Sequence, residues 1–236
     1  MAKALTIEWL DAAAASKAYP ARAPFARVLI CDLHDPALAP WRSIAPHAGD
    51  LADAHYPGAS GRSHFIERRL VLRAFVARCA GAAPDAIRIF YDEHGAPRVG
   101  GADVFVSVSS RGSRIALAAA SSPVGVDLER VEDAGPVIED VLGKRERQTL
   151  ERLSSDARGQ AFVRIWTAKE AYLKAIGRGF KRDPALINIS ARANMFTLED
   201  TGFAAELAAG AFVAMKEEIV ACAVLPAGAA SGELHA

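Results

Sequence analysis

The sequence predicts an α+β fold of two pseudo-symmetric lobes, each a long helix packed on a small antiparallel sheet, with a ligand cleft between them. Two observations lead to this prediction. The chain has 236 residues, of which 51% are hydrophobic, so it is long and apolar enough for a packed core. A long helical pattern followed by three or four strand-like patterns also occurs twice along the chain. We place the boundary between an N-terminal lobe, residues 1–121, and a C-terminal lobe, residues 122–236.

The first lobe is defined by a change of pattern near residue 63. Residues 36–61 are rich in Pro and Gly, which indicates a surface loop, with a short helix at 48–54. Apolar residues then recur at helical spacing, which predicts a helix with Ser63 as its N-cap and with Gly81 and Pro84 as its stop signals. Strands are expected at residues 5–10, 27–33, 86–91, 104–109 and 115–120.

The second lobe repeats this order. A strand at 123–131 is followed by a short amphipathic helix at 145–153 and a longer helix at 160–176, for which Gly177 is a good C′ residue. Strands are expected at residues 185–190, 202–207, 211–216 and 218–225.

Charge and composition exclude several classes of protein. The 28 basic and 28 acidic residues balance, which argues against a surface built for nucleic acid or for an anionic membrane. No apolar run is long enough to cross a bilayer, and Glu8 and Asp11 interrupt the N-terminus where a secretory signal needs apolar residues, so we expect a cytoplasmic protein. Cys31, Cys79 and Cys222 are widely separated, which predicts small buried side chains, not a disulfide framework or a zinc site.

Apolar and acidic residues alternate in the segment Gly125–Glu129, GVDLE. In a strand this alternation places the two apolar side chains on one face and Asp127 and Glu129 together on the other. Two carboxylates on one face repel each other unless water or a cation neutralises them. An edge strand with a solvated acidic face is one interpretation, and a site for a hard cation such as Mg²⁺ is the other.

The segment Trp166–Lys174, WTAKEAYLK, lies inside the second long helix. Glu170 and Lys174 share a helix face, so they form at least a surface pair worth about 0.3–0.5 kcal/mol. Trp166 lies one turn before Glu170 on the same side, and a Trp, a carboxylate and an ammonium in one line indicate the wall of a pocket. Trp166 as an ordinary core residue is the alternative.

Together these two segments resemble the two signature motifs of the 4′-phosphopantetheinyl transferases, and the chain length resembles the two-lobed, surfactin-synthetase-activating type. Weaker similarity lies upstream. Residues 62–73 resemble the arginine-bearing first helix of the family, Gly95-Ala96-Pro97 its Gly-x-Pro turn, and residues 107–112 its Ser-His segment. The resemblance covers residues 60–190, and residues 1–61 match no part of the family.

The resemblance implies Mg²⁺-dependent transfer of the 4′-phosphopantetheine arm of coenzyme A to a serine of an apo acyl- or peptidyl-carrier protein, which releases adenosine 3′,5′-bisphosphate. It also implies that Asp127, Glu129 and Glu170 hold Mg²⁺. Glu170 is the expected base for the serine proton, directly or through a water, and Lys174 is expected to neutralise phosphate charge.

The resemblance further implies a set of residues that contact coenzyme A. Arg69, near the middle of the first long helix, fits the family's arginines better than Arg73, for which a structural role is expected. Lys169 either contacts coenzyme phosphates or braces its own helix. The full set is Arg62, Arg69, His94, Ser109, Arg111, Lys169 and Lys174.

Two departures from the family pattern reduce the number of phosphate ligands. Ser110 stands in place of the histidine of the Ser-His segment, and Ala96 stands where many members have lysine. Either Arg111 or His94 compensates, or coenzyme affinity is low, or the substrate differs.

These departures motivate an alternative, a divergent and catalytically weak homologue that binds coenzyme A or a carrier protein without efficient transfer. A second alternative is an interaction module whose charged segments are solvated surface. For a carrier-modifying enzyme we expect a monomer with a basic docking surface, because the family's carrier proteins are acidic. The candidates for that surface are Lys144, Arg145, Arg147, Arg178, Lys181 and Arg182.

Overall fold

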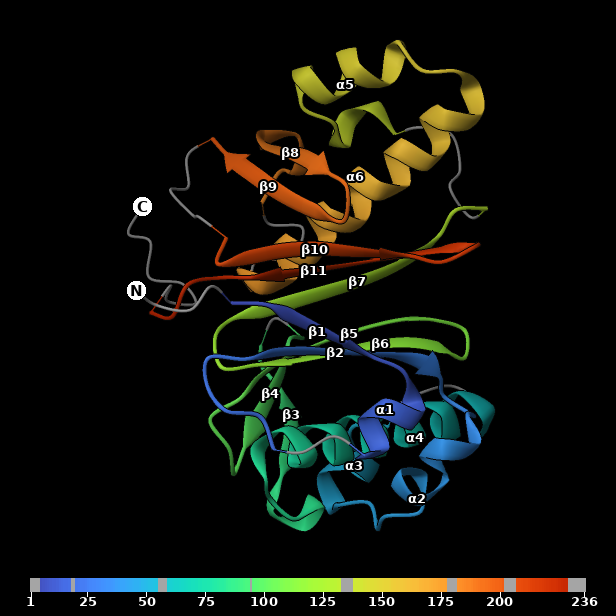
Figure 1. The fold of residues 1–236 in the computed structure, drawn as a ribbon. Helices are drawn as coiled ribbons and strands as arrows, with labels where there is room; N and C mark the ends of the chain where they lie inside the picture. The colour runs from blue at the N-terminus through green and yellow to red at the C-terminus, as the bar shows by residue number, and fades with distance from the viewer. Residues whose placement is uncertain are drawn as a thin grey trace.

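The computed structural model describes residues 5–17, 20–54, 59–93, 95–132, 138–177, 182–201 and 207–228. Its elements form four layers: the long helix α4, a first sheet, a second sheet and the long helix α6 (Figure 1). The predicted α+β fold of two lobes is therefore confirmed. Every strand of the first sheet ends by Ala120, and every strand of the second sheet begins at or after Val124.

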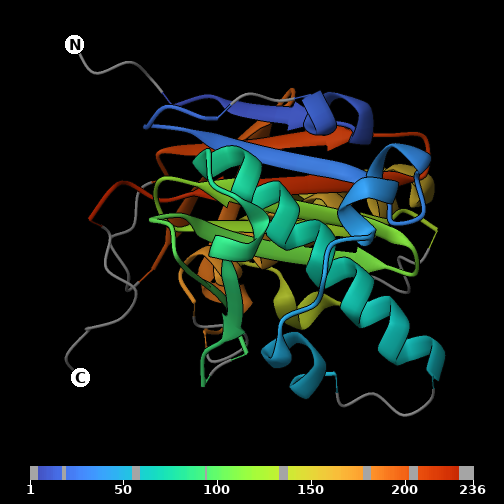
Figure 2. The ribbon, with the colours of Figure 1, turned by 90° about the horizontal axis from the view of Figure 1, so that it is seen from below.

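The first sheet has the strand order β1-β2-β6-β5. Strand β1 runs parallel to β2, so this sheet is mixed and not purely antiparallel as expected. Helix α4 crosses its outer face (Figure 2), and apolar side chains of α4 such as Phe75 join Leu29 and Leu117 of the sheet in one core. The bounds of these elements are β1 Ile7–Leu10, β2 Ala26–Asp32, α4 Ala59–Ala80, β5 Phe105–Arg111 and β6 Arg114–Ala120.

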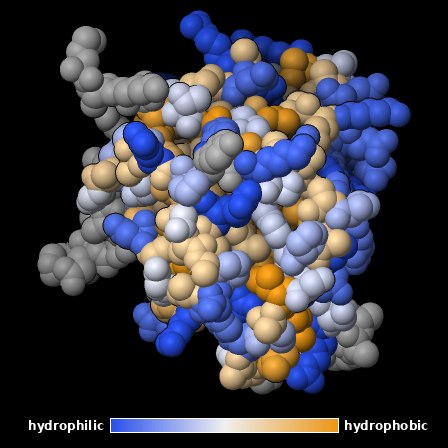
Figure 3. Space-filling view, turned by 60° about the horizontal axis from the view of Figure 1, so that its bottom comes forward, coloured by the Kyte–Doolittle hydropathy of each residue, from blue (hydrophilic) through white to orange (hydrophobic). Residues whose placement is uncertain are grey.

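Short elements surround the first sheet. The hairpin of β3 and β4 forms a separate two-stranded sheet beside α4. In the space-filling view of the helical side, the strongly hydrophobic residues form small groups separated by hydrophilic ones (Figure 3). The short elements are α1 Ala12–Lys17, η1 Pro36–Leu38, α2 Ala39–Arg42, α3 Ala48–Ala52, η2 Pro84–Ala86, β3 Arg88–Tyr91 and β4 Pro97–Gly100.

The second sheet is antiparallel throughout, with the strand order β7-β11-β10-β9-β8. Helix α6 packs on its outer face, where Tyr172 and Leu173 meet Ile187 and Ala221. The bounds are β7 Val124–Arg130, η3 Glu139–Val141, α5 Lys144–Glu151, α6 Ser155–Ala175, η5 Pro184–Leu186, β8 Ile187–Arg192, β9 Met195–Asp200, β10 Ala209–Ala214 and β11 Glu218–Val224.

The two sheets pack against each other through small apolar side chains. Ala116 and Ala118 of β6 belong to the same buried cluster as Val126 and Leu128 of β7. Cys222 of β11 lies fully buried in this layer, and Cys31 and Cys79 are also free and buried, as predicted. The inter-sheet contact holds the two lobes together and sets the position of β7, the strand with the acidic motif.

Most predicted elements are present with shifted ends. Helix α4 begins before the expected N-cap Ser63, and Gly177 adopts a φ of 67° after α6, as a C′ glycine does. The sequence patterns did not predict the strands β4 and β9 or the short helices α1 and α2. Residues 202–206 of one expected strand lie outside the described residues. No helix in the described part of the chain is long and apolar enough to cross a membrane.

Candidate functional site

The glycine of the acidic motif allows strand β7 to touch helix α6. A Cβ atom on Gly125 would lie 1.8 Å from the Ala171 carbonyl oxygen and 2.6 Å from the Ala175 amide nitrogen. Both distances are far below any real contact, so a side chain at this position would push the strand and the helix apart. Gly125 therefore brings the acidic residues of β7 directly beneath the helix that carries Glu170 and Lys174.

The alternation in β7 places its side chains as predicted. Val126 and Leu128 point into the core between the sheets, while Asp127 pairs in register with Ala221, which belongs to the core under α6. Asp127 is only 2% exposed. Its Oδ1 accepts hydrogen bonds from Lys174 Nζ at 2.7 Å and from Ser109 Oγ at 2.9 Å. Asp127 and Lys174, which were both predicted as site residues, are therefore in direct contact.

Strand β5 lies along β7 and contributes polar side chains at every second position. Ser107 Oγ accepts a hydrogen bond from the Val126 amide at 3.1 Å, and Ser109 reaches Asp127. Arg111 donates two hydrogen bonds to Glu129, one of them at 3.0 Å from Nε to Oε2. Sequence reasoning missed Ser107, although the period of two from 107 to 111 was a signal that could have found it.

Burial and like charge perturb the carboxylates of this cluster. The pKa of Glu170 is raised to about 7, chiefly by burial and also by the charges of Asp127 and Glu129, against the lowering effect of Lys174 and Arg111. Burial likewise raises the pKa of Glu129, against the opposing hydrogen bond from Arg111. Glu170 is therefore a carboxyl whose protonation changes near neutral pH, within the electrostatic reach of two other acids.

Two carboxylate oxygens of the cluster have no hydrogen-bond partner. Asp127 Oδ2 and Glu170 Oε1 are buried and unpaired within the described part of the chain. Buried unpaired oxygens are costly, and carboxylate oxygen is the ligand that Mg²⁺ prefers, so the donor chemistry fits a hard cation. As the side chains lie, no group of three Asp, Glu, His or Cys among the described residues is arranged to hold a metal ion. Magnesium binding by all three acids stays a prediction.

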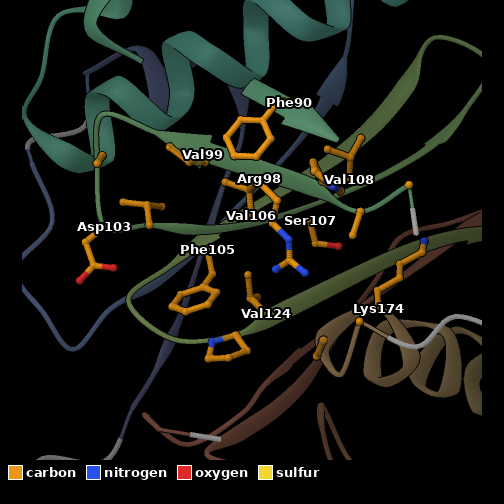
Figure 4. Close-up of a pocket in the computed structure, with 18 of the residues that line it drawn as sticks. Phe90, Arg98, Val99, Asp103, Phe105, Val106, Ser107, Val108, Val124 and Lys174 are labelled. Carbon is orange, nitrogen blue, oxygen red and sulfur yellow. The ribbon is translucent and has the colours of Figure 1, made fainter. Parts of the chain in front are cut away.

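A cleft of about 1010 Å³ opens between the lobes beside this cluster. Its walls come from the hairpin strand β4, from β5, from the start of β7 and from the end of α6 (Figure 4). Apolar side chains such as Phe90, Phe105 and Val124 form much of the surface, and Lys174 and Ser107 bring polar atoms to it. The cleft expected between two lobes is therefore present and adjoins the acidic cluster.

Of the expected coenzyme residues that the structure describes, Lys174 lines the cleft, whereas the others do not: Arg62, Arg69, Ser109, Arg111 and Lys169. Arg69 is 2% exposed and binds Asp50 at 3.1 Å, Asp53 at 2.7 Å and the Ile89 carbonyl at 2.5 Å. As placed, Arg69 is buried and does not line the cleft; it ties α3 and β3 to α4, and the neighbouring Arg73 also joins α3 to α4 through Asp50 at 2.6 Å. The prediction for Arg69 is corrected accordingly. Arg62 is exposed on α4 and does not line the cleft.

Lys169 is a structural residue in this structure. It is fully buried, and its Nζ donates to Glu146 at 2.5 Å, to the Val141 carbonyl at 2.7 Å and to the Pro184 carbonyl at 2.9 Å. Of the two roles considered for it, bracing the helix is the one that its contacts support, because a buried ammonium with three acceptors has no donor left for a coenzyme phosphate. The prediction of a coenzyme contact is corrected.

The remaining predicted residues have mixed outcomes. Trp166 is half-buried against the apolar cluster between α5 and α6, which matches the core alternative and not a wall of the cleft. Ser110, at the position of the missing histidine, accepts a hydrogen bond from Arg68 Nη1 at 2.8 Å. His94 lies outside the described residues.

The family comparison matches the part of the chain that contains the cluster. A family model described as the 4′-phosphopantetheinyl transferase superfamily matches residues 123–223. This segment of the chain is similar to the superfamily. The acids Asp127, Glu129 and Glu170 all lie within it, and the sequence resemblance is confirmed at the level of the superfamily.

Two named relatives and one solved structure are similar to parts of this chain. A putative 4′-phosphopantetheinyl transferase, slr0495, of Synechocystis is 26% identical over 66% of this chain and 66% of its own length. The 4′-phosphopantetheinyl transferase HetI of Nostoc is 30% identical over 51% of this chain and 54% of its own length. A crystal structure of a holo-(acyl-carrier-protein) synthase from Bacillus anthracis, 21% identical, covers 45% of this chain and 97% of that one with a TM-score of 0.41. The chain thus spans about half to two thirds of the curated relatives that it matches.

Proposed function

We propose that this protein transfers the 4′-phosphopantetheine arm of coenzyme A to a serine of an apo acyl- or peptidyl-carrier protein and releases adenosine 3′,5′-bisphosphate. The observation that carries the proposal is the partly buried cluster of Asp127, Glu129, Glu170 and Lys174 beside the inter-lobe cleft, inside the segment that matches the superfamily. Coenzyme A would lie in the cleft with its pyrophosphate toward Lys174.

The reaction makes three chemical demands. Displacement at a pyrophosphate by a serine hydroxyl needs neutralised phosphate charge, a base near the nucleophile and a cation for the leaving group. Lys174, whose Nζ lies 2.7 Å from Asp127 and 3.2 Å from the Val126 carbonyl, is held at the edge of the cleft and supplies a fixed positive charge. Asp127 and Glu170, joined by Glu129, would hold Mg²⁺, which supplies charge neutralisation on the phosphates when bound.

Glu170 suits the role of the base. Without a bound cation its pKa is raised to about 7, near the value at which a group both accepts and releases a proton at neutral pH. Its buried Oε1 has no partner among the described residues, so it is not committed to a structural bond. Glu170 would take the proton of the carrier serine while Lys174 stabilises the charge that develops on the leaving phosphate.

The carrier protein would dock near helix α5. Lys144, Arg145 and Arg147 are exposed on this helix, and Arg145 makes only an exposed pair with Glu199 at 3.2 Å. Exposed basic residues attract an acidic partner and raise the association rate more than the affinity. Arg182 is less suited than expected because it is engaged with Asp200, and Arg178 and Lys181 lie outside the described residues. We propose that a monomer suffices, since both walls of the cleft come from one chain.

A direct assay tests the proposal. The protein is incubated with an apo carrier protein, coenzyme A and Mg²⁺, and the carrier is analysed by mass spectrometry. We expect the mass of the carrier to rise by one phosphopantetheine arm, and the rise to disappear when the carrier serine is replaced by alanine. If the mass of the carrier stayed unchanged at every concentration of coenzyme A and Mg²⁺, the transferase proposal would be refuted.

The weak homologue remains the second candidate. It is favoured by Lys174 and Arg111, which neutralise Asp127 and Glu129 in the structure, and by Ser110, which lacks the imidazole of the family. A titration calorimetry experiment separates the two: coenzyme A that binds without any gain in carrier mass identifies the weak homologue.

A further inference from the structure

Arg111, the last residue of strand β5, engages both carboxylate oxygens of Glu129. Its Nε donates a hydrogen bond to Glu129 Oε2 at 3.0 Å, and its Nη2 donates to Glu129 Oε1, so the pair is bidentate. The third nitrogen, Nη1, donates to the Ser110 carbonyl at 3.3 Å. The whole guanidinium is therefore directed at Glu129 and at its own strand.

Glu129 differs in this respect from the other two acids of the cluster. Asp127 Oδ2 and Glu170 Oε1 have no hydrogen-bond partner among the described residues, so each of these acids has an oxygen that suits a hard cation. In the described part of the chain no three acidic side chains are arranged to hold a metal ion. A site made of all three acids therefore requires side chains to move, and Glu129 has to leave Arg111 before it can ligate.

The position of Arg111 gives its side chain room to move. The side chain is 42% exposed, whereas that of Glu129 is 12% exposed. Arg111 precedes Gly112, which has a φ of 58° at the turn between β5 and β6, and no atom lies within 4 Å of the place that a Cβ on Gly112 would take. A guanidinium released from Glu129 would enter water at this open turn, where solvent screening limits the cost of breaking the pair.

The charges of the cluster can be balanced in two ways. The groups whose charge acts on Glu129 are Asp127, Arg111 and Lys174, and Glu170 experiences the same charges. As the side chains lie, the two basic residues offset two of the three acids. A divalent cation together with Lys174 would offset all three ionised carboxylates, and Arg111 would then be a surplus positive charge beside the metal ion. Arg111 and a divalent cation are therefore alternatives at Glu129.

We propose that Arg111 is an internal counter-ion that competes with the divalent cation for Glu129 and thereby lowers the metal affinity of the site. The inference rests on the proposed function, because it takes the acidic cluster as a metal site. Arg111 acts through Glu129 and is a positioning residue. When its guanidinium leaves for solvent, Glu129 can join Asp127 and Glu170 at the cation.

The test measures the binding of Mn²⁺, as a probe of the divalent site, by electron paramagnetic resonance of the free ion, without coenzyme A or carrier. The matched control is Arg130→Gln, which removes an equal charge from the next residue of β7, where Arg130 lies 3.8 Å from Glu132. Because no ion pair has to be broken, Arg111→Gln should bind Mn²⁺ roughly 10-fold more tightly than the wild type. Arg130→Gln should stay within roughly 2-fold of the wild type, because its charge is exposed and screened.

The same measurement in a Glu129→Gln background separates competition from a long-range effect of charge. A neutral amide forms no ion pair with Arg111, so Arg111 has nothing to hold away from the metal ion. Glu129→Gln should bind Mn²⁺ more weakly than the wild type, because it loses a ligand. Adding Arg111→Gln to it should then tighten binding by no more than roughly 2-fold.

A second readout follows the guanidinium itself. The NMR signal of the Arg111 Nε–H group is assigned by its absence from Arg111→Gln. Saturation of the wild type with Mg²⁺ should shift this signal and broaden it through exchange with water, because the hydrogen bond to Glu129 is lost. A signal that saturating Mg²⁺ leaves unchanged would overturn the inference.

Four binding results would also overturn it. They are no Mn²⁺ binding by any variant, an affinity of Arg111→Gln equal to or below that of the wild type, an equal gain in Arg130→Gln, and an equal gain in the Glu129→Gln background. If Arg111→Gln does not fold, Arg111→Lys replaces it and should tighten binding by a smaller factor, because an ammonium cannot pair with both oxygens in parallel; an unchanged affinity again overturns the inference.

Failure of this inference can be distinguished from failure of the proposed function. A wild type that modifies the carrier while Arg111→Gln does not tighten Mn²⁺ binding defeats this inference alone. A protein whose metal affinity responds as expected but that modifies no carrier defeats the proposed function and supports the competition at Glu129.

Discussion

Replacement of Lys169 by methionine should destabilise the second lobe strongly without affecting coenzyme binding. The substitution keeps the volume of the side chain but leaves the Glu146 carboxylate, 4% exposed, without its counter-ion. Breaking a buried ion pair from one side costs about 3–5 kcal/mol. Glu146 retains hydrogen bonds from the Gly143 and Ile189 amides, both at 2.8 Å, which places the expected loss in the free energy of unfolding near the lower end, about 3 kcal/mol.

The assay is urea denaturation at pH 7, followed by circular dichroism, for the wild type, Lys169→Met, Glu146→Gln and the double variant. The double variant should recover part of the loss, because it removes the uncompensated buried charge. Coenzyme A affinity, measured by calorimetry well below the unfolding midpoint, should be the same for Lys169→Met and the wild type. A Lys169→Met variant whose free energy of unfolding falls by less than about 1 kcal/mol would refute the bracing role. A variant that keeps its stability but loses coenzyme affinity would instead support a phosphate contact for Lys169.

Three further predictions concern the strand, the base and the docking surface. Gly125→Ala should lower the free energy of unfolding by about 1–3 kcal/mol or more in urea denaturation, because its Cβ collides with the α6 backbone, whereas Gly159→Ala, with open space around its Cβ, should not. Glu170, whose pKa is raised from 4.5 to about 7, binds more protons folded than unfolded in this range, so stability falls as pH rises from 4.5 to 7. Without divalent cations at pH 8, the free energy of unfolding of Glu170→Gln, measured in urea, should therefore exceed that of the wild type. The expected difference is about 1–2 kcal/mol, after allowance for the partial exposure of Glu170. Arg145→Glu with Arg147→Glu should slow the association of an acidic carrier in stopped-flow measurements at low salt and have little effect at high salt.

Each of these predictions has a contradictory outcome. Equal stability of the two alanine variants would mean that β7 and α6 are not in close contact at Gly125. A Glu170→Gln variant that is less stable than the wild type at pH 8 would contradict the raised pKa. An association rate that does not change in the double charge reversal would remove α5 from the docking surface.

Local patterns predicted much of the site but not the connections between its segments. The alternation of GVDLE and the spacing of Glu170 and Lys174 correctly placed the side chains on one face of a strand and of a helix, because those periods are properties of the local backbone. That Asp127 and Lys174 meet depends on the packing of β7 against α6, which only the resemblance suggested. The close approach at Gly125 gives the physical reason for that packing.

The errors come from residues whose partners are far away in sequence. Arg69 looked like a coenzyme ligand because helical spacing shows which face it shares but not that Asp50, in the short helix expected at 48–54, lies beneath that face. Lys169 was included among the coenzyme contacts for the same reason, since Glu146 is distant in sequence and comes from another helix.

The most direct test of the account measures carrier modification by Glu170→Gln. The variant is compared with the wild type and with Glu217→Gln, which changes an exposed carboxylate of the same lobe. Circular dichroism first shows that all three proteins have the same folded spectrum. General-base catalysis contributes about 100-fold or more, so we predict that Glu170→Gln forms holo-carrier at least about 100-fold more slowly while Glu217→Gln matches the wild type. Holo-carrier formed by Glu170→Gln at the wild-type rate would contradict the claim that the cluster of Asp127, Glu129 and Glu170 is the catalytic site.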